Sequence, residues 1–65
     1  MKIKDRLKKY RLDHNLTQLS MAKELGVSIR TYNRLENGHT ALNTSTVSKI
    51  SNLLKISVKT VRGLL

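Results

Sequence analysis

An all-α fold of five short helices is the structure that this sequence predicts. Apolar residues recur at intervals of three and four along most of the 65-residue chain, which is the spacing of one helical face. Residues that cap helices stand before these segments, and glycine or asparagine follows several of them. With 38% apolar residues the chain has material for one small core, so we expect a single domain over residues 1–65.

The first helix is expected from about Ile3 to Asp13. Ile3, Leu7 and Tyr10 fall at positions i, i+4 and i+7, which places them on one apolar face. Asn15 follows, and asparagine tolerates positive φ better than most residues other than glycine. We therefore expect Asn15 to be the left-handed residue that ends this helix.

The second and third helices are separated by only three residues, 26–28. Thr17 is a suitable N-cap for a helix that starts at Gln18, and Gly26 is suited to end it in left-handed geometry. Ser28 is the next N-cap, and the third helix should extend from Ser28 to Asn37. Two short helices joined by so short a turn must cross steeply, which requires a small residue at the crossing, such as Ala22.

The fourth and fifth helices are expected in the C-terminal third. Asn43 or Thr44 caps the fourth helix, and Ser57 caps the fifth. β-branched residues cluster at 44–47 and 56–61, where strands are the competing interpretation, but the helical spacing favours helices. The apolar positions expected for the two helices are Val47, Ile50, Leu53 and Leu54, and then Val58, Val61, Leu64 and Leu65.

The charge balance points to a polyanionic partner. Thirteen Lys and Arg residues against four acidic ones give a net charge of +9, which suits nucleic acid or an anionic membrane surface. No apolar run approaches the roughly 18 residues of a membrane span. The four carboxylates are dispersed, so no catalytic constellation is evident and we expect no enzyme. There is no cysteine, and His14 and His39 lack the spacing of a metal pair, so neither a metal nor a cofactor is expected.

The order of residues in the central segment resembles the helix-turn-helix family of lambdoid phage repressors and Cro proteins, and the resemblance covers nearly the whole chain. It implies a five-helix, lambda-repressor-like DNA-binding domain with the helix-turn-helix at helices two and three. The chain departs from the family at Asn15 and Lys55, where glycine is usual, and at Leu42, where proline is frequent. The resemblance is carried by Tyr10-Arg11, Leu16-Thr17-Gln18, Met21-Ala22, Leu25-Gly26-Val27-Ser28 and Leu35-Glu36-Asn37-Gly38.

The family resemblance implies that the third helix lies in the major groove of double-stranded DNA. Arginine pairs bidentately with guanine, asparagine pairs with adenine, and an apolar side chain packs on the thymine methyl group. The residues that match the family's base-contacting positions are Ser28, Ile29, Arg30, Asn33 and Arg34.

Contacts to the DNA backbone are expected at helix N-termini, where free N–H groups attract anions. Arg11 and Glu36 match positions that form a partly buried ion pair in the family, so we assign both to structure. The residues expected to contact phosphates are Thr17, Gln18, Asn37, Thr40 and Asn43.

These expectations describe a sequence-specific transcriptional regulator, a Cro- or immunity-type repressor that occupies a palindromic operator. One domain reads few base pairs, so two copies are expected on the site, as a weak homodimer or a dimer formed on DNA. We expect it in the cytoplasm, prokaryotic or phage-encoded and associated with the nucleoid.

The sequence also raises three functions other than binding of double-stranded DNA. A membrane-surface role is disfavoured because the apolar face of the first helix matches core positions, and RNA binding because only two aromatic residues are present. The serious alternative is the same fold acting through a protein partner, as an antitoxin or antirepressor. Leu12 and Leu19 are not evident core residues and would suit such an interface.

Overall fold

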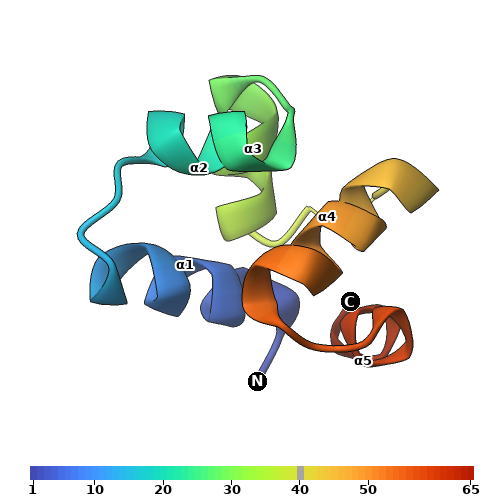
Figure 1. Ribbon diagram of the computed structural model, residues 1–65. Helices are drawn as coiled ribbons and strands as arrows, with labels where there is room; N and C mark the ends of the chain where they lie inside the picture. Colours follow the sequence, from blue (N-terminus) through green and yellow to red (C-terminus); the bar gives the residue numbers. More distant parts are fainter. Residues whose placement is uncertain (40) are drawn as a thin grey trace.

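Five helices make up the computed structural model, which describes residues 1–39 and 41–65 and contains no strand among them. The predicted all-α fold is confirmed. The helices are α1 (Ile3–Asp13), α2 (Gln18–Leu25), α3 (Ile29–Glu36), α4 (Thr44–Leu54) and α5 (Val58–Leu64), as Figure 1 shows.

Four of the five helices begin at a polar side chain that accepts a backbone N–H bond from three residues further on. Thr17 and Ser28 cap α2 and α3 with oxygen-to-nitrogen distances of 3.0 and 3.1 Å. Asn43 and Ser57 cap α4 and α5 at 2.8 and 3.0 Å. Asn43, and not Thr44, is thus the cap of α4. Each cap satisfies one of the donors that a helix start leaves without an intrahelical partner.

The ends of α1, α2 and α4 are followed by left-handed backbone. Gly26 has a φ of +66°, and Asn15, as predicted, has a φ of +53°. Lys55 has a φ of +56° although it stands where the family usually has glycine. The loop after α4 therefore has left-handed backbone at a lysine, although glycine is the residue that favours this conformation.

The core draws on all five helices. Tyr32 and Leu35 of α3 are buried against residues of α1 and α2, and Ala22 is only 1% exposed. Tyr10, Leu53 and Leu54 are only partly buried, so they border the core. Val58, an expected apolar position of α5, is instead 40% exposed, whereas Val61 of the same helix is fully buried. The largest fully buried side chains are those of Ile3, Leu7, Met21, Leu25, Tyr32, Leu35, Val47, Ile50 and Val61.

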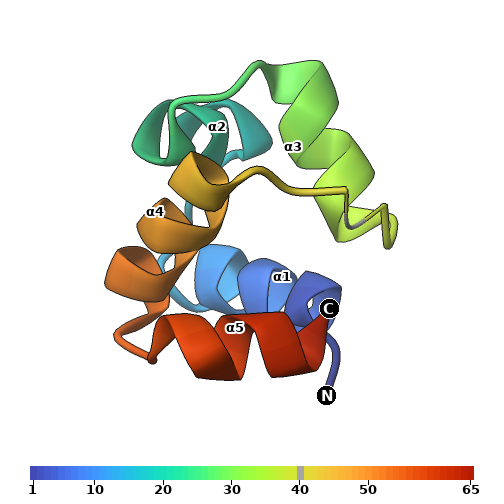
Figure 2. The ribbon, with the colours of Figure 1, turned by 90° about the vertical axis from the view of Figure 1, so that its right-hand side faces the viewer.

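The order of the helices in space leaves one face of α3 uncovered. Helix α3 contacts α2 and α1, while α4 contacts α2, α1 and α5. Figure 2 shows α2 and α3 together at one end of the molecule, with α4 descending from them toward α5. Both chain ends lie at the opposite end, where Met1, Lys2, Leu64 and Leu65 line a common hollow. Among the described residues, no helix is long and apolar enough to cross a membrane.

Candidate nucleic-acid interface

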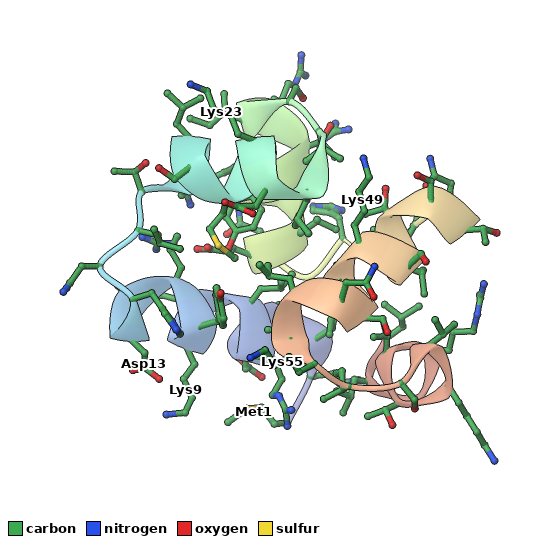
Figure 3. All side chains as sticks on the ribbon, viewed as in Figure 1. Met1, Lys9, Asp13, Lys23, Lys49 and Lys55 are labelled. Carbon is green, nitrogen blue, oxygen red and sulfur yellow. The ribbon has the colours of Figure 1, made fainter. Side chains whose placement is uncertain are left out.

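The turn between α2 and α3 is tight because of Gly26. Its backbone N–H donates to the carbonyl of Lys23, and the N–H of Val27 donates to that of Ala22. A Cβ at Gly26 would be strained by the positive φ and would also meet the Nζ of Lys49. Figure 3 shows that Lys49 projects from α4 on the side of the molecule that carries α2 and α3. Glycine at this position therefore leaves room for the end of the Lys49 side chain beside the turn.

The outer face of α3 is exposed and polar, with one exception. Only Tyr32 and Leu35 of this helix are buried. Ile29 is 48% exposed at the start of the helix, beside arginine and asparagine side chains. All five residues expected to read bases lie on this uncovered surface, namely Ser28, Ile29, Arg30, Asn33 and Arg34.

The residues expected to contact phosphates are dispersed over three elements. Thr17 and Gln18 lie at the start of α2, Asn37 follows α3, and Asn43 precedes α4. The hydroxyl of Thr17 is occupied, since it caps α2 and donates to Ser20. The expected contact at Thr40 lies outside the described residues.

Arg11 and Glu36 join α1 to the end of α3. The Nε of Arg11 donates to Oε2 of Glu36 at 2.7 Å, and an Nη atom donates to Oε1 at 3.2 Å. A further Nη bond of 3.3 Å goes to the carbonyl of Leu16. The two side chains are 16% and 6% exposed. We call this bidentate pair the brace, because it ties two helices that are distant in the sequence.

The brace determines the ionisation of its members. Burial opposes the ionised form of Glu36, but hydrogen bonds from Arg11 and Gln18 outweigh it and hold the pKa of this carboxyl below its usual value. The hydrogen bond to Glu36 raises the pKa of Arg11. Burial also raises the pKa of Tyr32, whose hydroxyl is buried next to the brace but lacks a hydrogen bond of good geometry among the described residues. The pair is therefore ionised throughout the neutral range.

A chain of three side-chain amides leads from the brace to the surface. The Nε2 of Gln18 donates to Oε1 of Glu36 at 3.3 Å, and the Nδ2 of Asn33 donates to Oε1 of Gln18 at 3.3 Å. The Nδ2 of Asn37 then donates to Oδ1 of Asn33 at 3.0 Å. We call Gln18, Asn33 and Asn37 the amide relay. Three residues that sequence reasoning assigned one by one to DNA are thus hydrogen-bonded to one another.

The sequence did not predict the contacts of two lysines near the helix-turn-helix. Lys49 approaches Gly26, and the side chain of Lys4 lies 3.5 Å from where a Cβ of Gly38 would be. Each of these glycines follows the end of a helix, where a cation is favourable. Nothing in the spacing of the sequence indicates either contact, because both lysines come from other helices.

A second ion pair among the described residues is remote from this face. Lys9 and Asp13 of α1 lie 3.3 Å apart and are mostly exposed. Figure 3 shows both projecting from the side of the molecule opposite to Lys23 of α2. Such a surface pair contributes little to stability. No group of acidic, His or Cys side chains suited to a metal occurs in residues 1–39 and 41–65.

Two short helices joined at a glycine turn, with a polar and basic outer face on the second, define a DNA-binding transcription regulator. The chain belongs to the helix-turn-helix family of phage-repressor type, whose profile matches residues 7–61. This is a family of DNA-binding regulators and not of enzymes.

A curated relative supports the same assignment. The transcriptional repressor RstR of the cryptic phage CTXphi, from Vibrio cholerae serotype O1, is 38% identical over 63 residues. The match covers 97% of this chain and 56% of the relative, so the chain spans about half the length of that protein. No solved structure matches the chain significantly.

Proposed function

We propose that this protein is a repressor that binds a palindromic operator in double-stranded DNA through α3. The observation that carries the proposal is the outer face of α3, which is uncovered by the rest of the fold and bears hydrogen-bonding and cationic side chains together with the half-exposed Ile29. An operator-bound protein of this kind would block access of polymerase to a promoter. The similarity to a protein named as a transcriptional repressor supports this direction of regulation.

The chemistry of the face suits readout of base edges. Arg30 and Arg34 each offer a planar fork of donors for the O6 and N7 atoms of guanine. Asn33 offers the donor and acceptor that adenine requires, and Ile29 would pack on a thymine methyl group. Ser28 adds a hydroxyl, although that oxygen already accepts the N–H of Thr31 and donates to its hydroxyl.

Backbone phosphates would be held on either side of α3. The free N–H groups at the start of α2, including that of Gln18, point to an anion site beside the outer face of α3, which we call the reading face. Asn37 and Asn43 would contribute from the segment between α3 and α4, with Thr40 between them. The net charge of +9 adds attraction that does not depend on sequence.

The palindrome follows from the size of the reading face. One α3 covers only a few base pairs, so specificity in a genome requires two copies on half-sites about 34 Å apart. We infer a weak homodimer or a dimer that forms on the DNA, in a prokaryotic or phage-infected cytoplasm.

Two arginine variants test this function. The operator is first obtained by selection of bound sequences from random double-stranded DNA, in which a repeated half-site is expected. Arg30→Ala or Arg34→Ala should then weaken binding to the selected site by about fivefold or more relative to random DNA, because a bidentate base contact discriminates by about 1 to 3 kcal/mol.

The control is Lys23→Ala, which removes a charge from the exposed surface of α2. It should weaken binding to both DNAs by similar factors. Equal losses on both DNAs for Arg30→Ala and Arg34→Ala would reassign the arginines to phosphates, and failure to select any sequence would refute the proposed function.

Two exposed leucines favour a second function, binding of a protein partner by the same fold. Leu12 is 55% exposed on α1 and Leu19 is 49% exposed on α2. Leu12→Gln and Leu19→Gln should leave operator binding unchanged if these residues serve a partner. Regulation in the cell that is lost in these variants, with DNA binding intact, would favour the partner-binding function.

A further inference from the structure

The amide relay gives Gln18 a role that a phosphate contact alone does not explain. Gln18 is the first residue of α2, yet its side chain is held between Glu36 on one side and Asn33 on the other. Asn33 is exposed on the outer face of α3, among the residues proposed to read bases. A buried anion is therefore connected to the reading face through one glutamine.

The direction of every bond in the relay follows from Glu36. An ionised carboxylate only accepts hydrogen bonds, so the atom of Gln18 that faces it must be the amide nitrogen. The oxygen of Gln18 is then turned toward Asn33 and must meet an N–H donor. Asn33 consequently directs its nitrogen to Gln18 and its oxygen to Asn37. The charge at Glu36 thus selects one of the two flipped orientations of the Asn33 amide.

The orientation of that amide decides what Asn33 recognises. Adenine presents the N7 acceptor and the N6 donor side by side, so an asparagine must offer its nitrogen and oxygen in matching order. In the relay, Asn33 retains one N–H and one oxygen lone pair beyond the bonds to Gln18 and Asn37. An amide held in one orientation before binding loses less conformational freedom and rejects the reversed pattern of donor and acceptor.

We propose that Gln18 is a specificity-determining positioning residue, which transmits the orientation set by Glu36 to the base-reading amide of Asn33. This inference rests on the proposed function, since it concerns which base the same face selects. Gln18 still offers its backbone N–H to a phosphate, so the side chain and the main chain serve different purposes.

The test compares base preferences at each position of the site. Double-stranded DNA with randomised positions is selected with the unaltered protein, Gln18→Ala, Asn33→Ala and the double variant. Asn33→Ala identifies the base pair that Asn33 reads. We expect Gln18→Ala to reduce the preference at that same pair by about fivefold to tenfold, a factor within the range of one bidentate contact. The double variant should lose no more than Asn33→Ala alone, because the two residues act through one contact.

Two matched variants separate positioning from other effects. Gln18→Ala combined with Arg34→Ala should show multiplicative losses, since Arg34 has no part in the relay. Gln18→Met keeps the length of the side chain without the amide, and it should reproduce the loss of preference even if Gln18→Ala is poorly folded. In the unbound protein, Gln18→Met should shift the side-chain ¹⁵N–¹H₂ resonances of Asn33 while thermal unfolding shows the fold to be retained.

Two results would overturn the inference. If Gln18→Ala and Gln18→Met weaken binding to every sequence by one factor and leave the preference at the Asn33 base pair intact, Gln18 is only a phosphate contact. If the Asn33 side-chain resonances do not move, the relay does not hold that amide. A protein that selects no sequence at all would instead refute the proposed function, so the two failures are distinguishable.

Discussion

Lys55 occupies backbone that glycine would adopt without strain. Its φ of +56° lies in the left-handed region, where a side chain with a Cβ crowds the following carbonyl oxygen. Two hydrogen bonds close the loop after α4 and retain this turn. The N–H of Ile56 donates to the carbonyl of Ser51, and the hydroxyl of Ser51 donates to the carbonyl of Ile56. A residue that disagrees with its local conformation is thus held by the bonds around it.

Replacing Lys55 with glycine should stabilise the protein. The relieved strain of about 1 to 2 kcal/mol exceeds the entropy of about 0.4 to 1 kcal/mol that glycine adds to the unfolded chain. We expect a net gain of about 0.5 to 1 kcal/mol in the free energy of unfolding, measured by urea denaturation. Asn15→Gly is the control and should gain less, because asparagine tolerates the left-handed region. A loss of stability in Lys55→Gly would contradict this account.

The helices are defined at their starts by side chains that accept backbone N–H groups. Ser28 and Ser57 form nearly identical caps, each accepting from a threonine nitrogen three residues on and pairing with the hydroxyl of that threonine. Ser28 begins the helix that carries the reading face, whereas Ser57 begins α5. The two serines therefore have the same local structure in different functional settings.

Because the two caps are alike, the effect of losing a cap on stability can be distinguished from an effect on DNA binding. Ser28→Ala and Ser57→Ala should each lower the free energy of unfolding by about 1 kcal/mol, the usual cost of an N-cap. Only Ser28→Ala should also weaken binding to the selected operator, because Ser28 is proposed to face the DNA. Unfolding measured by circular dichroism and binding measured by fluorescence anisotropy give the two readouts. Equal effects of both variants on DNA binding would remove Ser28 from the interface.

At the scale of the whole molecule, the brace joins two helices that are distant in the sequence. Arg11 and Glu36 are 25 positions apart, and their contact unites α1 with the end of α3. Loss of one partner would leave a largely buried charge without its counterion, at a cost of about 3 kcal/mol or more. For a chain of this length, that is a large share of the total stability.

The brace predicts a loss of stability in acid. The pKa of Glu36 is lower in the folded protein than in the unfolded chain, so the unfolded state binds the proton more readily. The stabilisation is complete above the pKa of an unfolded glutamate, about 4.3, and disappears as the pH falls through the lower folded value. Urea unfolding between pH 6 and pH 3 should show this decline.

Glu36→Gln tests the origin of that decline. The variant should be less stable at pH 6 and should lose less on acidification than the unaltered protein. Asp13→Asn, which alters the exposed pair with Lys9, should keep the full decline. A decline of undiminished size in Glu36→Gln would assign the acid sensitivity to other carboxylates.

The sequence by itself determined the five helices, the N-caps of α2, α3 and α5, and the glycine turn. These features depend on residues three or four positions apart, so the periodicity of Ile3 and Leu7 or the cap at Ser28 is readable without the fold. Family resemblance further indicated which face of α3 to consider. Peripheral residues were less predictable, because helical spacing does not show how far a short terminal helix is covered by the rest of the fold. Val58 has helical spacing but remains exposed.

Only the tertiary structure decided how the candidate site is organised. The sequence named Gln18, Asn33 and Asn37 separately, but their connection requires α2 and α3 to cross so that residues 15 positions apart meet. The approach of Lys49 to Gly26 and of Lys4 to Gly38 depends likewise on the packing of other helices. Hydrogen bonds are short-ranged and directional, so which polar groups pair is decided by the positions of the backbones that carry them.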